Sequence, residues 1–265
     1  MPLKEATGDG VVRNDRLVAD ANRVYFEALA RSRGSLSRLP ALALVVGFLL
    51  LVCNVGPLNA PDHYQGYETL SYLSGTNVAL IWICVIVFVL AMFKRLTHRY
   101  QVISSAAMTG MALMLVYALC SLTIPVATLI QARGERIYAI LFNAVGFFAV
   151  VLVLVATAVH VMFLRRRLVD GHSEKRMLGN LVAASRSNRS KSLCIAFGVA
   201  LVVPNVLTQG QFVVNVLGAA ALLFLAVLTP GLPVEFAYLT CLKARDKLYW
   251  ERPSRSAGRR QSRPK

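Results

Sequence analysis

Charged side chains are scarce in this sequence. Only 16% of its 265 residues are Asp, Glu, Lys or Arg, whereas 56% are hydrophobic. Soluble domains usually carry about 25% charged residues, so this composition excludes an ordinary soluble domain. The apolar residues form runs long enough to cross about 30 Å of hydrocarbon as helices. The sequence therefore predicts an all-α fold, a polytopic bundle of membrane-spanning helices.

Motifs for nucleotide, metal and redox chemistry are also missing. The chain has no GxxxxGK loop, no GxGxxG sequence and no HExxH pair. Its five cysteines occur singly, without a CxxC pair, and its four histidines are dispersed. We therefore expect no metal site and no cofactor.

The apolar runs predict about six transmembrane helices. The last two expected spans are short and are joined by the turn Gln209-Gly210-Gln211, so a re-entrant hairpin is the alternative for that pair. The six spans are expected near 41–57, 76–93, 104–130, 137–164, 192–208 and 212–232.

Positive charge predicts the direction of these helices. Of the 29 Lys and Arg residues, 27 lie before the first span, in 94–103, in 165–191 or after 242, and two lie in 131–136. Cytoplasmic flanks of membrane proteins are enriched in Lys and Arg. Both termini are therefore expected in the cytoplasm. Arg-rich flanks favour a bacterial cytoplasmic membrane, with a eukaryotic endomembrane as the alternative.

Two segments flank the predicted transmembrane domain of residues 40–242. Residues 1–39 form a cytoplasmic segment with an amphipathic helix over Asp15–Arg31, lying in the membrane interface or packing on the inner loops. Pro233 is expected in the first turn of a juxtamembrane helix, with Glu235 near its start. Residues 243–265 form a basic tail, disordered from about 252.

The basic flanks also predict partners. A positive inner face attracts the anionic lipid headgroups of the bilayer. Nucleic acid is a less favoured partner, because topology already explains the positive charge and no recognition motif accompanies it.

Amide side chains are distributed unevenly along the predicted spans. Five asparagines lie toward the outer ends of five different helices, and hydrocarbon offers an amide no hydrogen-bond partner. If these faces converge, they line a shallow polar cavity open to the outside. The alternative is that amides so close to the interface reach water and form no site. The five are Asn54, Asn77, Asn143, Asn205 and Asn215, and the last four are the candidate ligand-binding residues.

Short motifs resemble the androgen-induced six-helix membrane family. They are Tyr72-Leu73-Ser74-Gly75-Thr76-Asn77, Thr109-Gly110 ahead of Tyr117, and Val214-Asn215-Val216-Leu217-Gly218. The resemblance implies six helices with both ends inside, and hydrolysis of fatty-acid esters of hydroxy fatty acids by an intramembrane Thr and His. Ser74 would occupy the nucleophile position. The histidine position falls near Asn143, which cannot serve as the general base that a hydroxyl nucleophile needs.

The leading interpretation is a non-enzymatic membrane protein. It would act as a small transporter-like or accessory membrane subunit whose outward polar site binds a small ligand or a partner helix. One alternative is an intramembrane lipid-ester hydrolase that uses Ser74. Another is an immunity or scaffold protein that acts through a membrane partner.

Overall fold

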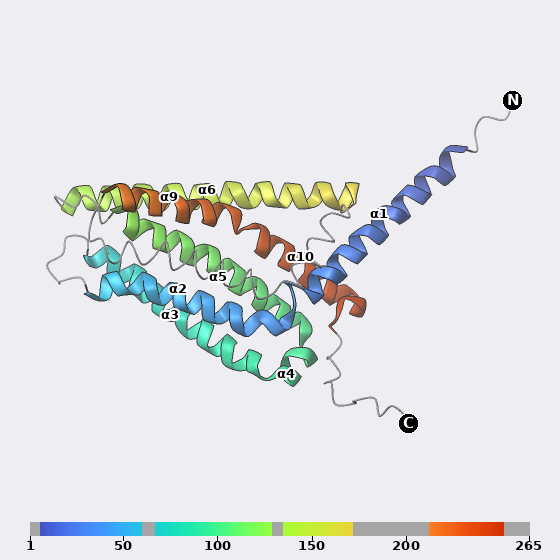
Figure 1. Cartoon of the computed structure of the whole chain (residues 1–265), viewed down its shortest axis with the longest axis horizontal. Helices are drawn as coiled ribbons and strands as arrows, with labels where there is room; N and C mark the ends of the chain where they lie inside the picture. The colour runs from blue at the N-terminus through green and yellow to red at the C-terminus, as the bar shows by residue number, and fades with distance from the viewer. Residues whose placement is uncertain (1–5, 60–66, 129–134, 172–211, 252–265) are drawn as a thin grey trace, which may run out of the picture.

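A computed structural model describes residues 6–59, 67–128, 135–171 and 212–251, and these ranges contain helices but no strand. The helices lie side by side in an elongated bundle, and α1 projects from one end of it (Figure 1). The elements are α1 Ala6–Arg31, η1 Leu36–Arg38, α2 Leu39–Asn59, α3 Tyr67–Met92, α4 Lys94–Arg99, α5 Gln101–Thr128, α6 Glu135–Asp170, α9 Phe212–Leu228, α10 Gly231–Arg245 and η2 Lys247–Tyr249.

Five stretches of the described chain are long and apolar enough to cross a membrane. The all-α, multi-pass prediction is therefore confirmed at this level. Four of the predicted spans coincide with α2, α3, α5 and α6, and the predicted span 192–208 lies outside the described residues. The five stretches are Leu17–Asn54, Leu73–Met92, Gln101–Thr123, Asn143–Asp170 and Gly218–Arg245.

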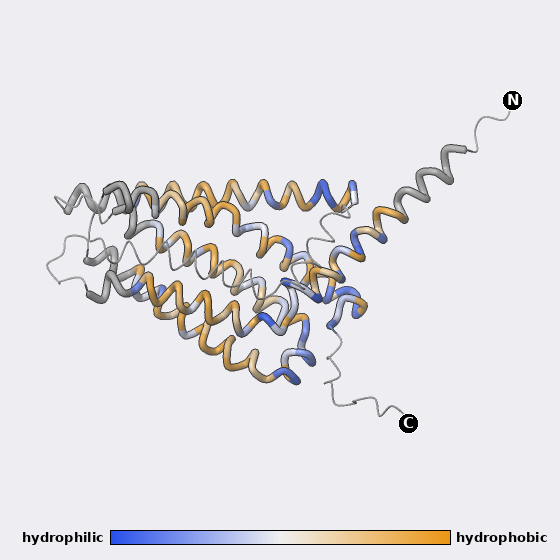
Figure 2. Tube along the Cα trace, in the orientation of Figure 1, coloured by the Kyte–Doolittle hydropathy of each residue, from blue (hydrophilic) through white to orange (hydrophobic). Residues whose placement is uncertain are grey.

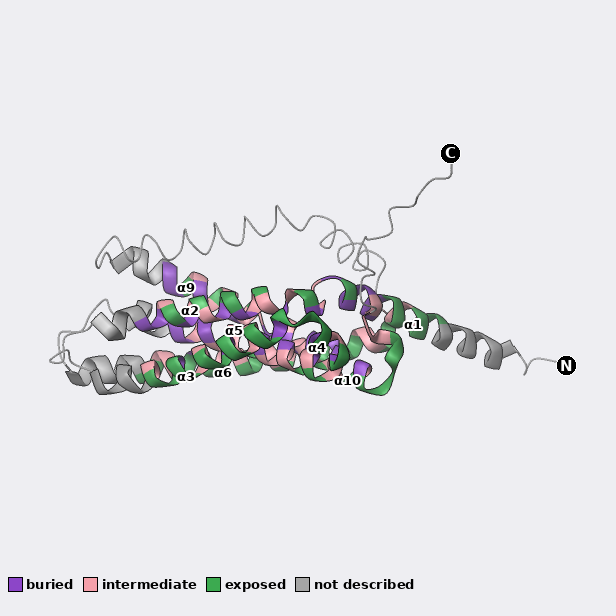
Figure 3. Cartoon of the chain, turned by 90° about the horizontal axis from the view of Figure 1, so that it is seen from below, coloured by how far each residue is buried: buried purple, intermediate pink, exposed green. Residues whose placement is uncertain are grey.

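Apolar side chains cover the outside of the bundle as well as its core. Buried residues line α2 and α5, while much of α3 and α6 is exposed (Figure 3). Trp82 on α3 and Phe147 on α6 are 63% and 73% exposed. Exposed apolar surface of this extent is unfavourable in water and favourable in lipid. The bundle thus has the surface of a membrane protein.

Hydrophilic residues gather at the end of the bundle from which α1 projects (Figure 2). We call this the basic end, and we call the opposite one the far end. The end of α1 with the turn after it, the start of α2 with η1, α4, the end of α6 and the end of α10 meet there (Figure 1), and these segments contain Arg31, Arg33, Arg38, Lys94, Arg95, Arg99, Arg165, Arg166, Arg167, Lys243 and Arg245.

The predicted sixth span, 212–232, differs from the structure at its end. The helix stops at Leu228, and a new helix, α10, begins at Gly231 after Thr229 and Pro230. Proline cannot donate a backbone hydrogen bond, so a helix breaks readily at that position. Pro233 lies in the first turn of α10, as predicted. The predicted boundary at 242 falls inside α10, which ends at Arg245.

Helix α1 begins at Ala6 and is therefore longer than the predicted Asp15–Arg31. Its last turns pack on the bundle: Tyr25, Phe26 and Leu29 are buried, and the Phe26 and Tyr238 rings lie 4.8 Å apart. Near its start the described side chains are more open, and Leu17 is exposed. The structure thus agrees with the packing alternative for the C-terminal turns of this helix.

Gly34 closes the turn after α1, and we predict that Gly34→Ala destabilises the protein by about 1–3 kcal/mol because overpacking forces the neighbours to move. A Cβ atom there would lie 2.9 Å from Leu239 Cδ2 and 3.0 Å from the Leu29 carbonyl oxygen. Chemical unfolding in mild detergent measures the change. Gly110→Ala is the matched control, because its Cβ would meet nothing within 4 Å. Equal stability of both variants would contradict this packing.

Candidate functional site

Two buried asparagines lie at one level on the neighbouring helices α2 and α3. A Cβ atom on Gly47 of α2 would lie 3.4 Å from Cys84 Cβ of α3, which fixes the level at which these antiparallel helices meet. Two helical turns span about seven residues, so Asn54 on α2 and Asn77 on α3 share one level nearer the far end. Asn54 is 1% exposed and Asn77 is 0% exposed.

Three of the four polar side-chain atoms of these amides lack hydrogen-bond partners in the described part of the chain. The unpaired atoms are Asn54 Oδ1 together with Asn77 Oδ1 and Nδ2. A buried polar group left unpaired costs about 1–3 kcal/mol, so the pair has a strong tendency to bind a polar species. A bound polar species could donate to the two amide oxygens and accept from the Asn77 amide nitrogen.

Neighbouring polar side chains on α5 are already paired. Ser121 Oγ donates to the Ala118 carbonyl oxygen at 3.1 Å and to Cys53 Sγ at 3.5 Å. Thr123 Oγ1 donates to the Leu119 carbonyl oxygen at 2.8 Å. These bonds lie within α5 or reach the neighbouring α2, so among the side chains described at this depth the unpaired hydrogen-bonding atoms belong to the two amides. We call Asn54 and Asn77 the amide pair.

Among the other predicted ligand-binding residues, only the side chain of Asn143 is described, and it does not join the amide pair. Asn143 lies on α6 and is exposed. Asn215 lies on α9, but its side chain is outside the described residues, as is the whole of Asn205. The described structure therefore brings together two of the five asparagines.

Ser74, the nucleophile position implied by the family resemblance, lies on α3 one turn before Asn77 and is partly buried. Of the two described histidines, His98 lies on α4 at the basic end. His160 lies against Gly231, where a Cβ atom would meet its Nδ1 at 3.2 Å. About 18 helical residues separate Ser74 from the end of α3, a rise of roughly 27 Å, so His98 is far from it. His63 and His172 lie outside the described residues.

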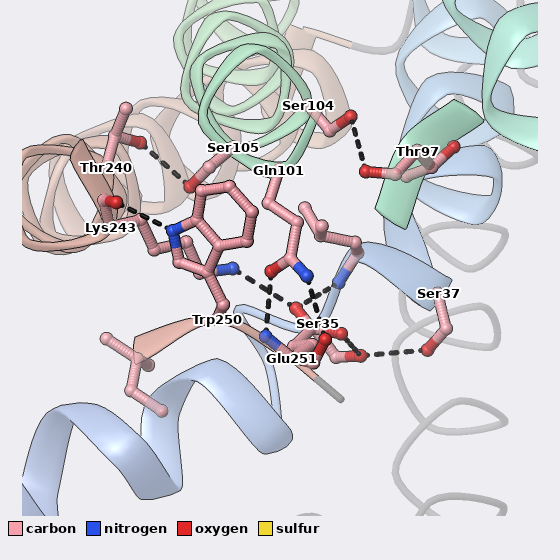
Figure 4. A network of polar contacts seen from close by, with 12 residues as sticks. Ser35, Ser37, Thr97, Gln101, Ser104, Ser105, Thr240, Lys243, Trp250 and Glu251 are labelled. Atoms are coloured by element: carbon pink, nitrogen blue, oxygen red, sulfur yellow. Dashed lines mark hydrogen bonds and ion pairs between the residues drawn. The ribbon is translucent and has the colours of Figure 1, made fainter. Parts of the chain in front are cut away.

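A second polar assembly lies at the basic end and was not predicted from the sequence. Its centre is Glu251 (Figure 4). The Glu251 carboxylate accepts hydrogen bonds from Lys243 Nζ at 3.2 Å, Ser35 Oγ at 3.0 Å and the Leu36 backbone N–H at 2.9 Å. Its backbone exchanges two bonds of 2.7 Å with the Gln101 side chain. We call these residues the Glu251 cluster.

The Glu251 cluster joins segments that are far apart in the sequence. Lys243 on α10 is 1% exposed, and a cation so deeply buried needs a paired anion. Trp250 Nε1 donates to the Lys243 carbonyl oxygen at 2.8 Å. The chain after α10 is therefore fixed as far as Glu251. The run Leu248-Tyr249-Trp250-Glu251, aromatic and acidic within a basic tail, is the sequence signal that could have indicated this.

Another ion pair ties α1 to α10. Glu235, predicted to lie at the interface near the start of its helix, is buried. It accepts hydrogen bonds from Arg33 Nη2 and from the Tyr25 hydroxyl, the latter at 3.1 Å. Arg33 Nη2 also donates to the Tyr25 hydroxyl oxygen at 3.1 Å. Each of the three side chains thus contacts the other two, where α1 and the segment after it pack on α10.

A polar hollow of about 550 Å³ lies between α1, α4 and the chain after α10. Arg23, Arg31 and His98 line it, and Glu27, which also lines it, forms ion pairs with both arginines. Tyr249 also lines it; burial raises the pKa of this phenol, and the Asp246 carboxylate raises it further. The Tyr249 hydroxyl is thus a neutral hydrogen-bonding group at physiological pH.

Metal-ligating side chains do not cluster within the described residues, where no group of three His, Cys, Asp or Glu could hold an ion. Comparison with known proteins also gives no assignment. No protein-family model, no curated protein and no solved structure matches this chain. The resemblance to the androgen-induced six-helix family thus stays a prediction.

Proposed function

We propose that this chain is a six-span membrane protein, with both termini in the cytoplasm, that binds a small uncharged polar solute at the amide pair in a transporter-like role. The observation that carries the proposal is the unpaired state of the amide atoms in a fully buried position. At this level the polar side chains described above are amides, hydroxyls and a thiol. An uncharged hydrogen-bonding solute matches them better than an ion does.

The direction of the helices supports six spans. Helix α6 runs toward the basic end, and α9 followed by α10 runs the same way beside it (Figure 1). The chain leaves α6 at the basic end and enters α9 nearer the far end. One further crossing between these two points is what the six-span proposal requires, and it assigns that crossing to the predicted span 192–208, which lies outside the described residues.

The orientation follows from charge. The basic end carries most of the described Lys and Arg residues, and positive residues are retained on the cytoplasmic side. With this orientation, the amide pair lies toward the outside. A bacterial cytoplasmic membrane is the proposed location, since the flanks are rich in Arg.

We predict that Asn77→Leu abolishes solute uptake and leaves the protein at least as stable as the wild type. Leucine removes two unpaired buried atoms, each of which costs about 1–3 kcal/mol. Uptake of glycerol and urea into reconstituted vesicles measures the first effect, and chemical unfolding measures the second. Thr123→Val is the control, because Thr123 bonds within its own helix.

Two results would overturn the proposal. Loss of stability in Asn77→Leu would mean that the amide is a structural group with partners of its own. Uptake unchanged by Asn77→Leu and by Asn54→Leu would mean that no solute passes or binds at the amide pair.

A second candidate is an accessory subunit for a membrane partner. It is favoured by α1, which projects from the bundle with Leu17 and Val24 exposed. Such a protein would co-purify with a second membrane chain and would show no uptake. A hydrolase based on Ser74 is less supported, since neither described histidine lies near it. Labelling of Ser74 by a fluorophosphonate probe would revive that alternative.

A further inference from the structure

The short helix α4 separates two hollows, one lined by polar and apolar groups together and the other lined almost entirely by apolar groups. On one side lies the polar hollow described above, which His98 lines. On the other lies an apolar groove of about 230 Å³ between the ends of α2, α3 and α5. Leu96 and Thr97 of α4 line this groove, so consecutive residues of one helix face both spaces.

The chain entering α2 shows the same division. Ser37 lines the polar hollow, and Leu39, two residues later, lines the apolar groove. Apolar contacts from Leu90 and Ile103 continue the groove along the bundle. The polar hollow and the apolar groove therefore adjoin at the contact between η1 and α4.

Positive charges around α4 outnumber negative ones. The two carboxylates that line the polar hollow, Glu27 and Glu251, are already paired with cations of the chain. Lys94, Arg95 and Arg99 are exposed on the helix itself. Within the polar hollow, Arg23 and Arg31 each use one nitrogen to contact Glu27, and a guanidinium carries five N–H donors. His98 Nδ1 has no hydrogen-bond partner among the described residues. Donors to an anion are thus in excess on this side of α4.

We propose that this site binds one anionic phospholipid of the cytoplasmic leaflet, with its phosphate and headgroup at the polar hollow and one acyl chain in the apolar groove. The proposal rests on the orientation proposed above, because that orientation puts α4 at the level of the cytoplasmic headgroups. Positive residues at this level attract anionic lipids generally. The polar hollow and the adjoining groove would in addition hold one lipid molecule at a defined site, which diffuse electrostatic attraction does not do.

The test uses the full chain purified in mild detergent and offered equal amounts of phosphatidylglycerol and phosphatidylcholine, with retained lipid counted by native mass spectrometry. The wild type should retain one phosphatidylglycerol in preference to phosphatidylcholine. The double variant Arg31→Gln/His98→Gln should lose about tenfold in this preference, the loss expected for charge-assisted hydrogen bonds. The control is Arg165→Gln, which removes one positive charge from an exposed position on α6 at the same end.

A second variant tests the groove. Ala107→Phe fills it and should reduce retention of both lipids, while Ala79→Phe at an exposed position of α3 should not. Equal effects of Arg165→Gln and the double variant would overturn the site in favour of diffuse charge attraction. Glycerol phosphate has no acyl chain. If it displaced the lipid, the proposed binding of an acyl chain in the groove would be contradicted. Solute uptake by these variants is independent of the lipid count, so the two proposals can fail separately.

Discussion

Replacement of Glu251 by alanine is expected to destabilise the protein by about 3–5 kcal/mol, the usual cost of leaving a buried charge without its partner. Lys243 Nζ, whose side chain is fully buried, would lose its carboxylate. Ser35 and the Leu36 backbone N–H would lose their acceptor as well. Chemical unfolding in mild detergent measures the change.

Replacement of the partner, Lys243→Met, should reduce the free energy of unfolding by less than Glu251→Ala does. Lys243→Met leaves the Glu251 carboxylate with two neutral donors, Ser35 Oγ and the Leu36 N–H. Glu251→Ala, by contrast, leaves a fully buried ammonium without an anion. Replacement of both charges of a buried pair by apolar side chains is often close to neutral. The double variant Lys243→Met/Glu251→Ala should then be more stable than Glu251→Ala alone. The reverse order would contradict the described cluster.

Replacement of Glu235 by alanine should cost about 2–3 kcal/mol, the value of a hydrogen bond that involves a charged group. The Arg33 guanidinium and the Tyr25 hydroxyl would both lose the carboxylate as a hydrogen-bond acceptor, and Arg33 Nε already lacks a described partner. Arg33 is partly open to solvent, which makes the loss smaller than at Lys243. Chemical unfolding monitored with a probe attached to α1 would detect the release of this helix from the bundle.

Two controls accompany Glu235→Ala. Glu235→Gln keeps an acceptor for Tyr25 and should fall between the wild type and the alanine variant. Glu27→Ala removes exposed ion pairs on α1, which are worth about 0–1 kcal/mol. A loss in Glu27→Ala as large as that in Glu235→Ala would mean that the contacts of Glu235 with Tyr25 and Arg33 do not hold α1.

The long helices could be predicted from the sequence because hydropathy reports the solvent around a helix, whatever its neighbours. Helices α2, α3, α5 and α6 follow this rule. The new helix containing Pro233 was predicted, but the end of the preceding span was placed at 232 instead of Leu228, because the apolar run continues through Pro230. The start of α1 was missed because polar residues before Asp15 carry no hydrophobic period.

Sites depend on contacts between distant residues, which composition does not report. Glu251 and Ser35 are separated by 216 positions, and nothing in either neighbourhood indicates the other. The amide pair was partly predictable, because buried amides are rare in apolar helices and therefore conspicuous. Its exact members were not, since the rotation of each helix decides which asparagine faces inward: Asn77 does and Asn143 does not.

The most direct test of the proposed six-span arrangement is labelling of single cysteines, in a cysteine-free background, with a membrane-impermeant maleimide added outside intact cells. Gln65→Cys should react, whereas Thr7→Cys and Ser262→Cys should react only after the membrane is opened. Glu251 is bonded to Ser35 and Leu36, so the two ends of the described chain share one side of the bundle. Reaction of Ser262→Cys from outside, with Thr7→Cys protected, would contradict the account.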